Sequence, residues 1–380
     1  MASVSESQVP LVDLQAQYQV LRSEIDAAIA RVIAESAFVG TSGNRFVRAF
    51  EAEFAEYAGR THCIACANGT DSLEILLQAA GIGSGDEVLV PALSWIATSE
   101  AVSSRGATPV FVDILPDLYS MNPSAAAALV TTRTKAIIPV HLYGAPARMT
   151  EIMAIADRAG LFVLEDCAQA HGARYFGAQV GTIGHAASYS FFPGKNLGAW
   201  GDAGAMVTND EALARRVRMI AQHGQAERKH DHQIEGRNSR MDGLQAAILS
   251  VKLKRLEVWT DRRRALAASY QSELRDVVAG MQAAPEGFRN VYHLFVVEVP
   301  NRDAAVAALA ADGISTAVQY PSPLPLLRAY EHRGYAAGEF PVATAATRRL
   351  LSLPLFPELT STQQARVCDS LRRFCNGQLM

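Results

Sequence analysis

Lys195 lies in an unusual setting for a lysine, the stretch SYSFFPGKNLGAWGDAG (residues 188–204). Aromatic residues precede it, and glycines interrupt the chain on both sides of it. A lysine that is kept partly dehydrated has a lowered pKa, and its free amine is a nucleophile toward carbonyl groups. The alternative interpretation is a lysine whose aliphatic stem packs while its ammonium reaches water. The residue types alone leave both interpretations open.

Two carboxylates, Glu165 and Asp166, end the apolar run in LFVLEDCAQAHGA (residues 161–173). A carboxylate at the end of a buried strand needs a partner, because a charge without one is costly to bury. It can cap the next helix, lie exposed at the rim of the sheet, or face a bound cation. The third possibility makes Asp166 a candidate binding residue.

A candidate anion site follows the strand-like run HCIACA, where Asn68-Gly69-Thr70-Asp71-Ser72 opens a helical pattern. The N-terminus of a helix presents unpaired backbone N–H groups and a partial positive charge, so it suits a phosphate. Gly69 lets a ligand approach the backbone closely. Taken alone, the stretch favours the interpretation of an ordinary capped helix with Thr70 or Asp71 as its cap.

Together, an amine, an acid and a phosphate cradle are the groups that hold pyridoxal 5′-phosphate. Lys195 would bind this cofactor as a Schiff base and, once released, would move a proton. A negative Asp166 would keep the ring nitrogen protonated, and the helix N-terminus would anchor the phosphate. We therefore predict that Lys195 and Asp166 are catalytic residues.

The elements that must position these groups show an α/β pattern. From residue 61, short apolar runs alternate with helical patterns, which predicts an α/β fold with a mostly parallel sheet flanked by helices. Ligands bind beyond the carboxyl ends of the strands in such sheets. A helical stretch from Leu244 to about Leu274 then leads to a smaller α+β part. We predict a large cofactor-binding domain over residues 1–255, N-terminal helices included, and a small C-terminal domain over residues 256–380.

Composition excludes several classes of protein. The 380 residues are 49% hydrophobic and 19% charged with a formal net charge of −3, which favours neither a nucleic-acid partner nor a membrane protein. The N-terminus lacks the pattern of a secretion signal, and five cysteines are an odd set, so we expect a cytoplasmic protein without disulfides. Cys63 and Cys66 form a C-x-x-C, but residues three apart on a strand face opposite sides, so we predict a buried strand and no metal site.

Four motifs carry a resemblance to the DegT/DnrJ/StrS family of fold-type-I, pyridoxal-phosphate-dependent sugar aminotransferases: ANGTDSL, LEDCAQAHGA, SYSFFPGKNLGAWGDAGA and GRNSRMDGLQAAIL. The resemblance covers nearly the whole chain. It implies a Schiff-base lysine at Lys195 and an acid at the ring nitrogen at Asp166. It further implies cofactor contacts from Gln169 near the phenolic oxygen, Gly69, Thr70, Asp71 and Ser190 at the phosphate, Trp95 stacked on the ring, and Asn238 from a neighbouring subunit.

The same resemblance implies an activity. Related dehydratases carry histidine at the position of Lys195, so the lysine implies transamination. The FFPGKNLGAWGD segment resembles members that act on dTDP- or UDP-linked 3-keto sugars, with L-glutamate as the expected amino donor. A homodimer with shared active sites is implied by Asn238. A 4-keto sugar aminotransferase and a non-catalytic regulatory homologue are the alternatives.

Three further side chains are candidates for contacts with the substrate. His171, Arg240 and Tyr320 are candidate substrate-binding residues, although each is equally interpretable as a structural residue. His230 and His232 form an H-x-H in a loop that also holds four basic residues, namely Arg228, Lys229, Arg237 and Arg240. We interpret this loop as one that meets the substrate diphosphate or the partner subunit rather than a metal.

Overall fold

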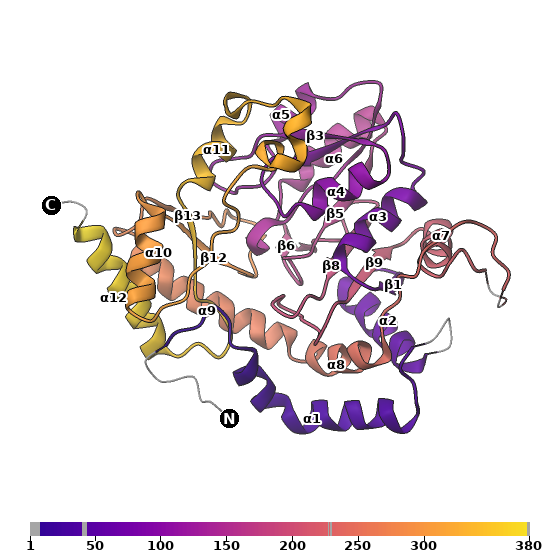
Figure 1. The fold of residues 1–380 in the computed structure, drawn as a ribbon, viewed down its shortest axis with the longest axis horizontal. Helices are drawn as coiled ribbons and strands as arrows, with labels where there is room; N and C mark the ends of the chain where they lie inside the picture. Colours follow the sequence, from indigo (N-terminus) through magenta and orange to yellow (C-terminus); the bar gives the residue numbers. More distant parts are fainter. Residues whose placement is uncertain (1–7, 40–43, 227, 229, 378–380) are drawn as a thin grey trace.

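The computed structural model of the chain describes residues 8–39, 44–226, 228 and 230–377. Its centre is a seven-stranded sheet with the strand order β1-β9-β8-β5-β4-β2-β3 (Figure 1). The strands are β1 (His62–Cys66), β2 (Glu87–Pro91), β3 (Thr108–Val112), β4 (Thr134–Ile137), β5 (Phe162–Asp166), β8 (Ala186–Ser190) and β9 (Gly204–Thr208). Neighbouring strands are parallel except at β9, which runs antiparallel to β1 and β8. The prediction of an α/β fold with a mostly parallel sheet is confirmed.

Helices cover both faces of this sheet. Buried side chains of one group of helices join the core on one face: α1 (Leu14–Ala34), α2 (Arg45–Ala58), α5 (Pro123–Ala128), α6 (Met149–Ala159) and α8 (Gly243–Leu253). A second group joins the core on the other face: α3 (Gly69–Ala79), α4 (Ala97–Ser104) and α7 (Glu211–Ala221). Helix α2 illustrates the cause, because Phe46, Phe50 and Phe54 recur at helical spacing and are all buried.

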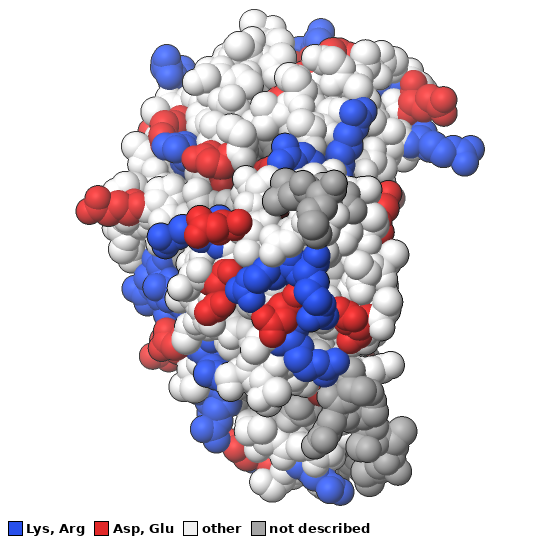
Figure 2. Space-filling view, turned by 90° about the vertical axis from the view of Figure 1, so that its left-hand side faces the viewer, with Lys and Arg blue, Asp and Glu red and all other residues white. Residues whose placement is uncertain are grey.

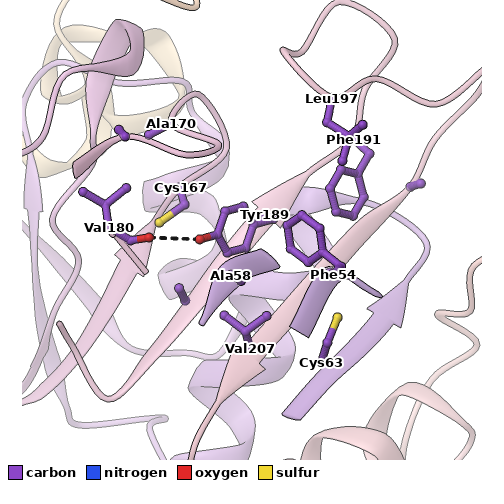
Figure 3. Close-up of a cluster of buried hydrophobic side chains, with 14 of the residues drawn as sticks. Phe54, Ala58, Cys63, Cys167, Ala170, Val180, Tyr189, Phe191, Leu197 and Val207 are labelled. Carbon is purple, nitrogen blue, oxygen red and sulfur yellow. Dashed lines mark hydrogen bonds between the residues drawn. The ribbon is translucent and has the colours of Figure 1, made fainter. Parts of the chain in front are cut away.

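The C-x-x-C of β1 confirms the interpretation of a buried strand. Cys63 packs in the core on one face of the sheet, beside Phe54 (Figure 3), whereas Cys66 packs in the core on the other face. Alternation along the strand sends the two thiols in opposite directions. All five cysteines are buried and free of disulfides.

A smaller unit packs beside the main sheet. Its antiparallel sheet has the order β10-β12-β13, formed by β10 (Gly280–Met281), β12 (Phe295–Glu298) and β13 (Leu350–Leu353). Three helices share its core: α9 (Leu256–Leu274), α10 (Arg302–Ala311) and α12 (Ser361–Gly377). The helical stretch that we expected from Leu244 to Leu274 is two helices, since α8 ends at Leu253 and α9 begins at Leu256.

The remaining elements connect the two units. A short sheet joins β11 (Phe288–Arg289), β6 (Arg174–Tyr175) and β7 (Ala178–Gln179). The 3-10 turns Leu142–Gly144, Leu324–Leu326, Arg328–Arg333 and Ala337–Glu339 and helix α11 (Pro341–Thr347) complete the described elements. Phe340 packs in the core of the large sheet, while Val9 packs in the core of the small unit and pairs with Ile314. Each unit therefore includes a segment from the other side of residue 255 in its core. The domain boundary at residue 255 stays a prediction.

The outer surface mixes charges of both signs. Figure 2 shows the face at the side of α10 and α12, where basic and acidic side chains are interspersed. An ion pair between α12 and the end of α10 joins Arg373 to Asp312 at 2.6 Å. Among the described helices, none has the length and the hydropathy that a membrane span requires.

Candidate active site

A cavity of about 620 Å³ opens at the carboxyl ends of the parallel strands. Eight of the twelve predicted site residues line it: Gly69, Thr70, Trp95, Asp166, Gln169, Ser190, Lys195 and Tyr320. Each comes from a loop or element end at this edge of the sheet, apart from Tyr320, which follows α10. The other four do not line the cavity: Asp71, His171, Asn238 and Arg240.

The N-terminus of α3 forms one end of the cavity. Asn68 is the cap, because its Oδ1 accepts a hydrogen bond from the Asp71 backbone N–H at 2.8 Å. The expectation that Thr70 or Asp71 caps this helix was wrong. A Cβ on Gly69 would lie 2.7 Å from the Cβ of Ser190, so only glycine fits between the helix and β8. The side chain of Asp71 turns away and lies 3.7 Å from Arg237.

Asp166 ends β5 and faces the cavity. Its Oδ1 accepts a hydrogen bond from the Ala168 backbone N–H at 3.1 Å, and its Oδ2 accepts one from the Thr98 hydroxyl at 3.0 Å. Burial raises the pKa of Asp166, and these donors together with Lys195 offset only part of the rise. Among the described residues, no cation forms an ion pair with Asp166. This carboxylate therefore has capacity for a cationic N–H of a ligand.

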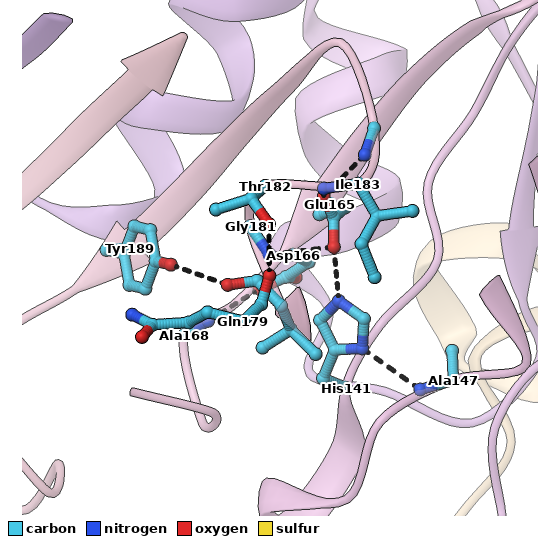
Figure 4. Close-up of polar contacts among 12 residues, drawn as sticks. His141, Ala147, Glu165, Asp166, Ala168, Gln179, Gly181, Thr182, Ile183 and Tyr189 are labelled. Atoms are coloured by element: carbon cyan, nitrogen blue, oxygen red, sulfur yellow. Dashed lines mark hydrogen bonds and ion pairs between the residues drawn. The ribbon is translucent and has the colours of Figure 1, made fainter. Parts of the chain in front are cut away.

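Glu165, the preceding residue, is enclosed on the other side of the strand (Figure 4). Its oxygens accept hydrogen bonds from the backbone N–H groups of Gly181, Ile183 and Gly184 at 2.7, 2.9 and 2.6 Å. The ring of His141 adds a fourth contact at 3.1 Å. Burial alone would raise the pKa of Glu165, but His141 and the backbone donors outweigh it, so the pKa is lowered. Glu165 is thus a structural carboxylate.

The side chains of His141, Glu165 and Cys167 also lie within 4.8 Å of one another, a spacing that a metal ion could bridge. The oxygens of Glu165 are already used by the contacts described above. His141 is also engaged through its second ring nitrogen, which accepts from the Ala147 backbone N–H at 3.0 Å. The group is satisfied without an ion.

Lys195 stands on the loop after β8, where its backbone N–H donates to the Phe192 carbonyl at 2.8 Å. The loop turns tightly at Gly198, where a Cβ would lie 2.2 Å from the Pro193 carbonyl oxygen. Burial lowers the pKa of the Lys195 ammonium to about 8, although Asp166 opposes the shift. About half of this amine is therefore unprotonated at pH 8, where an ordinary lysine is almost fully protonated.

Gln169, Trp95 and Tyr320 form a connected wall of the cavity. The Gln169 Oε1 accepts from the Tyr143 backbone N–H at 2.6 Å, which leaves its Nε2 to donate to the Tyr320 hydroxyl at 3.1 Å. The rings of Trp95 and Tyr320 lie 5.8 Å apart at 41°. The indole of Trp95 is 58% exposed, so one of its faces is available to a planar ligand.

His171 lies beneath the cavity rather than in its lining. It is fully buried among Phe54, Tyr189 and Phe191, and neither ring nitrogen has a hydrogen-bond partner among the described residues. Burial and the nearby Lys195 lower the pKa of His171 to about 3, so the ring is neutral. Its predicted contact with substrate stays a prediction without support from this geometry.

Asn238 and Arg240 lie on the surface, outside the cavity of their own chain, and the Arg240 Nε donates to the Asn238 Oδ1 at 3.0 Å. In the same region, His230 and His232 are exposed. Lys229, one of the four basic residues that we predicted for this loop, lies outside the described residues. Of the loop side chains that the structure describes, none lines this cavity.

Two groups of cavity residues were missed by the sequence analysis. Leu11 and Val12 line the cavity from the N-terminal segment, and His293 and Arg263 line it from the small unit. Arg263 could have been found from the sequence, because its position follows the helical spacing of the apolar residues of α9. In the structure its side chain is only 4% exposed. His293 could not have been found in this way, since the pattern VYHLFVVEV is compatible both with a histidine in a cavity wall and with one on the surface of a sheet.

Comparison with known proteins identifies the class. The model of the DegT/DnrJ/EryC1/StrS aminotransferase family matches residues 20–372. The chain belongs to this family, as the sequence motifs predicted.

Three individual relatives are similar to the chain over nearly their whole length. The chain is 45% identical to a UDP-N-acetyl-3-dehydro-alpha-D-glucosamine 3-aminotransferase of Acidithiobacillus ferrooxidans, over 97% of this chain and 98% of that protein. It is 46% identical to a pleiotropic regulatory protein of Geobacillus stearothermophilus, over 96% and 98% of the two chains. The crystal structure of S. venezuelae DesV in complex with a ketimine intermediate superposes with a TM-score of 0.93, at 43% identity over 97% and 98% of the chains.

The cavity fits pyridoxal 5′-phosphate on its own chemistry. The Lys195 amine, the buried Asp166 carboxylate and the open N-terminus of α3 line one cavity, and the glycine at residue 69 keeps the helix end clear of side-chain atoms. When bound, the cofactor supplies an electron-accepting ring that stabilises a carbanion next to the reacting nitrogen.

Proposed function

We propose that the chain is a pyridoxal-phosphate-dependent aminotransferase that moves an amino group to carbon 3 of a nucleotide-linked 3-keto sugar. The observation that carries this proposal is the convergence of Lys195, Asp166 and the α3 N-terminus on one cavity. The relative from Acidithiobacillus ferrooxidans, whose name specifies a 3-aminotransferase, supports carbon 3 as the position of the transfer. The product would be a nucleotide-linked amino sugar.

The roles of the residues follow from their surroundings. Lys195 holds the cofactor and, with a pKa near 8, both accepts and returns a proton near neutral pH. Asp166 holds a proton on the ring nitrogen, because a buried carboxylate with only neutral donors gains from a cationic partner. The α3 N-terminus binds the phosphate. Gln169 and Tyr320 orient each other beside the ring, where Trp95 stacks.

The finer assignments concern the amino donor, the nucleotide, the assembly and the location. L-glutamate as the donor and dTDP or UDP as the nucleotide follow from the motifs that resemble 3-keto sugar members of the family. A homodimer is supported by Asn238 and Arg240, which lie outside the cavity of their own chain and would need a second copy to reach a ligand. A cytoplasmic location is supported by five buried, reduced cysteines.

The test is a turnover assay with the purified, cofactor-loaded chain. We expect consumption of L-glutamate and formation of an amino sugar with 3-keto nucleotide sugars, and little turnover with 4-keto nucleotide sugars. Lys195→Ala should neither bind the cofactor covalently nor turn over substrate, whereas Lys254→Ala, an exposed lysine, should behave as the unmodified chain. Preference for 4-keto sugars would contradict the proposed position of transfer.

A non-catalytic regulatory role is the second candidate, because one relative is named a regulatory protein. The intact amine, acid and anion site argue against it, since a protein that only binds a ligand has no need of a reactive amine and a carboxylate that line the same cavity. Cofactor binding without turnover of any amino donor and keto sugar would favour this role.

A further inference from the structure

His293 lines the cavity beside Lys195, and the function proposed above gives it no role. Its side chain is tied directly to the residue that follows the lysine, because His293 Nδ1 lies 3.3 Å from the Oδ1 of Asn196. Asn196 is only 3% exposed, so this contact is shielded from water. His293 and Lys195 thus line the same cavity, and Lys195 is close enough to contribute to lowering the pKa of the imidazole.

The hydrogen bonds around Asn196 fix the tautomer of His293. The Nδ2 of Asn196 donates to the Val291 carbonyl oxygen at 3.2 Å, and a carbonyl oxygen can only accept. Asn196 must therefore present its Oδ1 to the imidazole, so the proton of a neutral ring lies on Nδ1. The other ring nitrogen, Nε2, is left with an unprotonated lone pair and no partner among the described residues.

The surroundings keep this imidazole neutral. Burial, together with the positive charges of Lys195 and Arg263 and the ring of His171, holds the pKa of His293 well below its usual range. The carboxylate of this region, Asp166, acts on Lys195 instead. Arg263 also fixes the backbone, because its NH1 group donates to the carbonyl oxygen of His293 at 3.4 Å and to that of Tyr292 at 3.2 Å.

We propose that Nε2 of His293 is the hydrogen-bond acceptor that orients the Lys195 ammonium after the lysine has taken up a proton. His293 is thus a positioning residue that acts through Lys195. A neutral acceptor suits this task, because it stabilises the ammonium only moderately. A second carboxylate would attract the ammonium more strongly and would keep Lys195 protonated. The inference rests on the proposed function only in treating the Lys195 amine as the reacting group.

The test compares two variants that each keep one end of the imidazole. His293→Asn retains an amide near the position of Nδ1, so it can still bind Asn196, but it lacks a group at Nε2. His293→Gln places an amide oxygen near the position of Nε2 and gives up the contact to Asn196. The pKa of Lys195 is measured on the full chain freed of cofactor, from the pH dependence of acetylation by trace acetic anhydride, with thermal unfolding as the check on folding.

The acetylation of Lys195 in the unmodified chain should be half-maximal near pH 8. Because loss of an acceptor destabilises the ammonium, His293→Asn should lower this midpoint by about one pH unit, while His293→Gln should leave it within about 0.3 units. Equal shifts in both variants, a shift in His293→Gln alone, or no shift in either would overturn the proposal. This measurement needs no turnover, so it stands apart from a failure of the proposed function.

Discussion

Strand β5 ends in two adjacent carboxylates whose surroundings on the two sides of the strand are opposite. Glu165 is enclosed by three backbone N–H groups and a histidine, whereas Asp166 receives two neutral donors and faces the cavity. Burial raises the pKa of both carboxyl groups, but the donors prevail at Glu165 and do not at Asp166. Depth of burial is therefore a poor guide to function, and the number of satisfied hydrogen bonds is a better one.

Two lysines repeat the contrast. Burial lowers the pKa of both Lys195 and Lys252 to about 8. The ammonium of Lys252 donates to the Gly198 carbonyl oxygen and is closed off from solvent, so it fastens the loop that carries Lys195. Lys195 has no ion pair within the described parts of the chain, and it faces the cavity. A similar pKa accompanies a structural role in Lys252 and the chemical role that we propose for Lys195.

The largest expected effect comes from the cavity side of β5. Asp166→Asn keeps the shape of the side chain and an oxygen that accepts from the Ala168 N–H, but its Nδ2 would have to donate to the Thr98 hydroxyl oxygen, and the charge is removed. We expect kcat to fall by about a thousandfold, the size seen when a charge-stabilising group is removed from an active site. The unfolding temperature should change little. Steady-state kinetics measures kcat, and calorimetry measures the unfolding temperature. A near-normal kcat in Asp166→Asn would contradict the difference in role that we assign to Asp166 and Glu165.

The opposite result is expected on the enclosed side of β5. Glu165→Gln leaves one acceptor oxygen for several buried donors, so the free energy of unfolding should fall by about 3 kcal/mol, measured by urea denaturation. The folded fraction should still bind cofactor. Glu211→Gln is the control, because Glu211 is 78% exposed and pairs with Arg215 on the surface. A normal stability with lost activity in Glu165→Gln would reverse the roles assigned here.

A smaller effect is expected at the anion site. Gly69→Ala places a Cβ 2.7 Å from the Cβ of Ser190, which must displace the helix end or the strand. We expect cofactor affinity to weaken by about thirtyfold, equivalent to about 2 kcal/mol of overpacking. Gly338→Ala, where a Cβ meets nothing within 4 Å, should leave affinity unchanged. Equilibrium titration with cofactor compares the two, and equal affinities would contradict the close approach at residue 69.

The smallest effect is that of pH on covalent attachment of the cofactor to Lys195. Below a pKa of about 8 the amine is protonated, and above it the reactive free amine predominates. The attachment rate should therefore rise about tenfold between pH 7 and pH 9 and then level off. Stopped-flow absorbance follows the rate. A midpoint near pH 10.5, the ordinary value for lysine, would show that burial does not lower this pKa.

Much of the fold and part of the site followed from local patterns. Alternating apolar runs predict the parallel sheet, and the strand ends place Asp166 and Lys195 at one edge of it. The motif resemblance added Gln169, Ser190 and Trp95, which line the same cavity. These features depend on short stretches of chain whose side-chain direction is set by the element that carries them.

Features that depend on distant segments were out of reach of the sequence. The environment of Glu165 comes from backbone groups at residues 181–184, which no side-chain pattern announces. His293 reaches the cavity through a contact with Asn196, 97 residues away. The packing of Phe340 against the large sheet likewise needs the return of the chain from the small unit. Local periodicity carries no information about such long-range contacts.

The central claim is tested most directly by finding the lysine that holds the cofactor. The full chain is incubated with pyridoxal 5′-phosphate, reduced with borohydride, digested and mapped by mass spectrometry. Our account predicts one modified residue, Lys195, with Lys252 unmodified despite its similar pKa. Modification of Lys252, or label spread over surface lysines with Lys195 unmodified, would contradict the assignment of the active site.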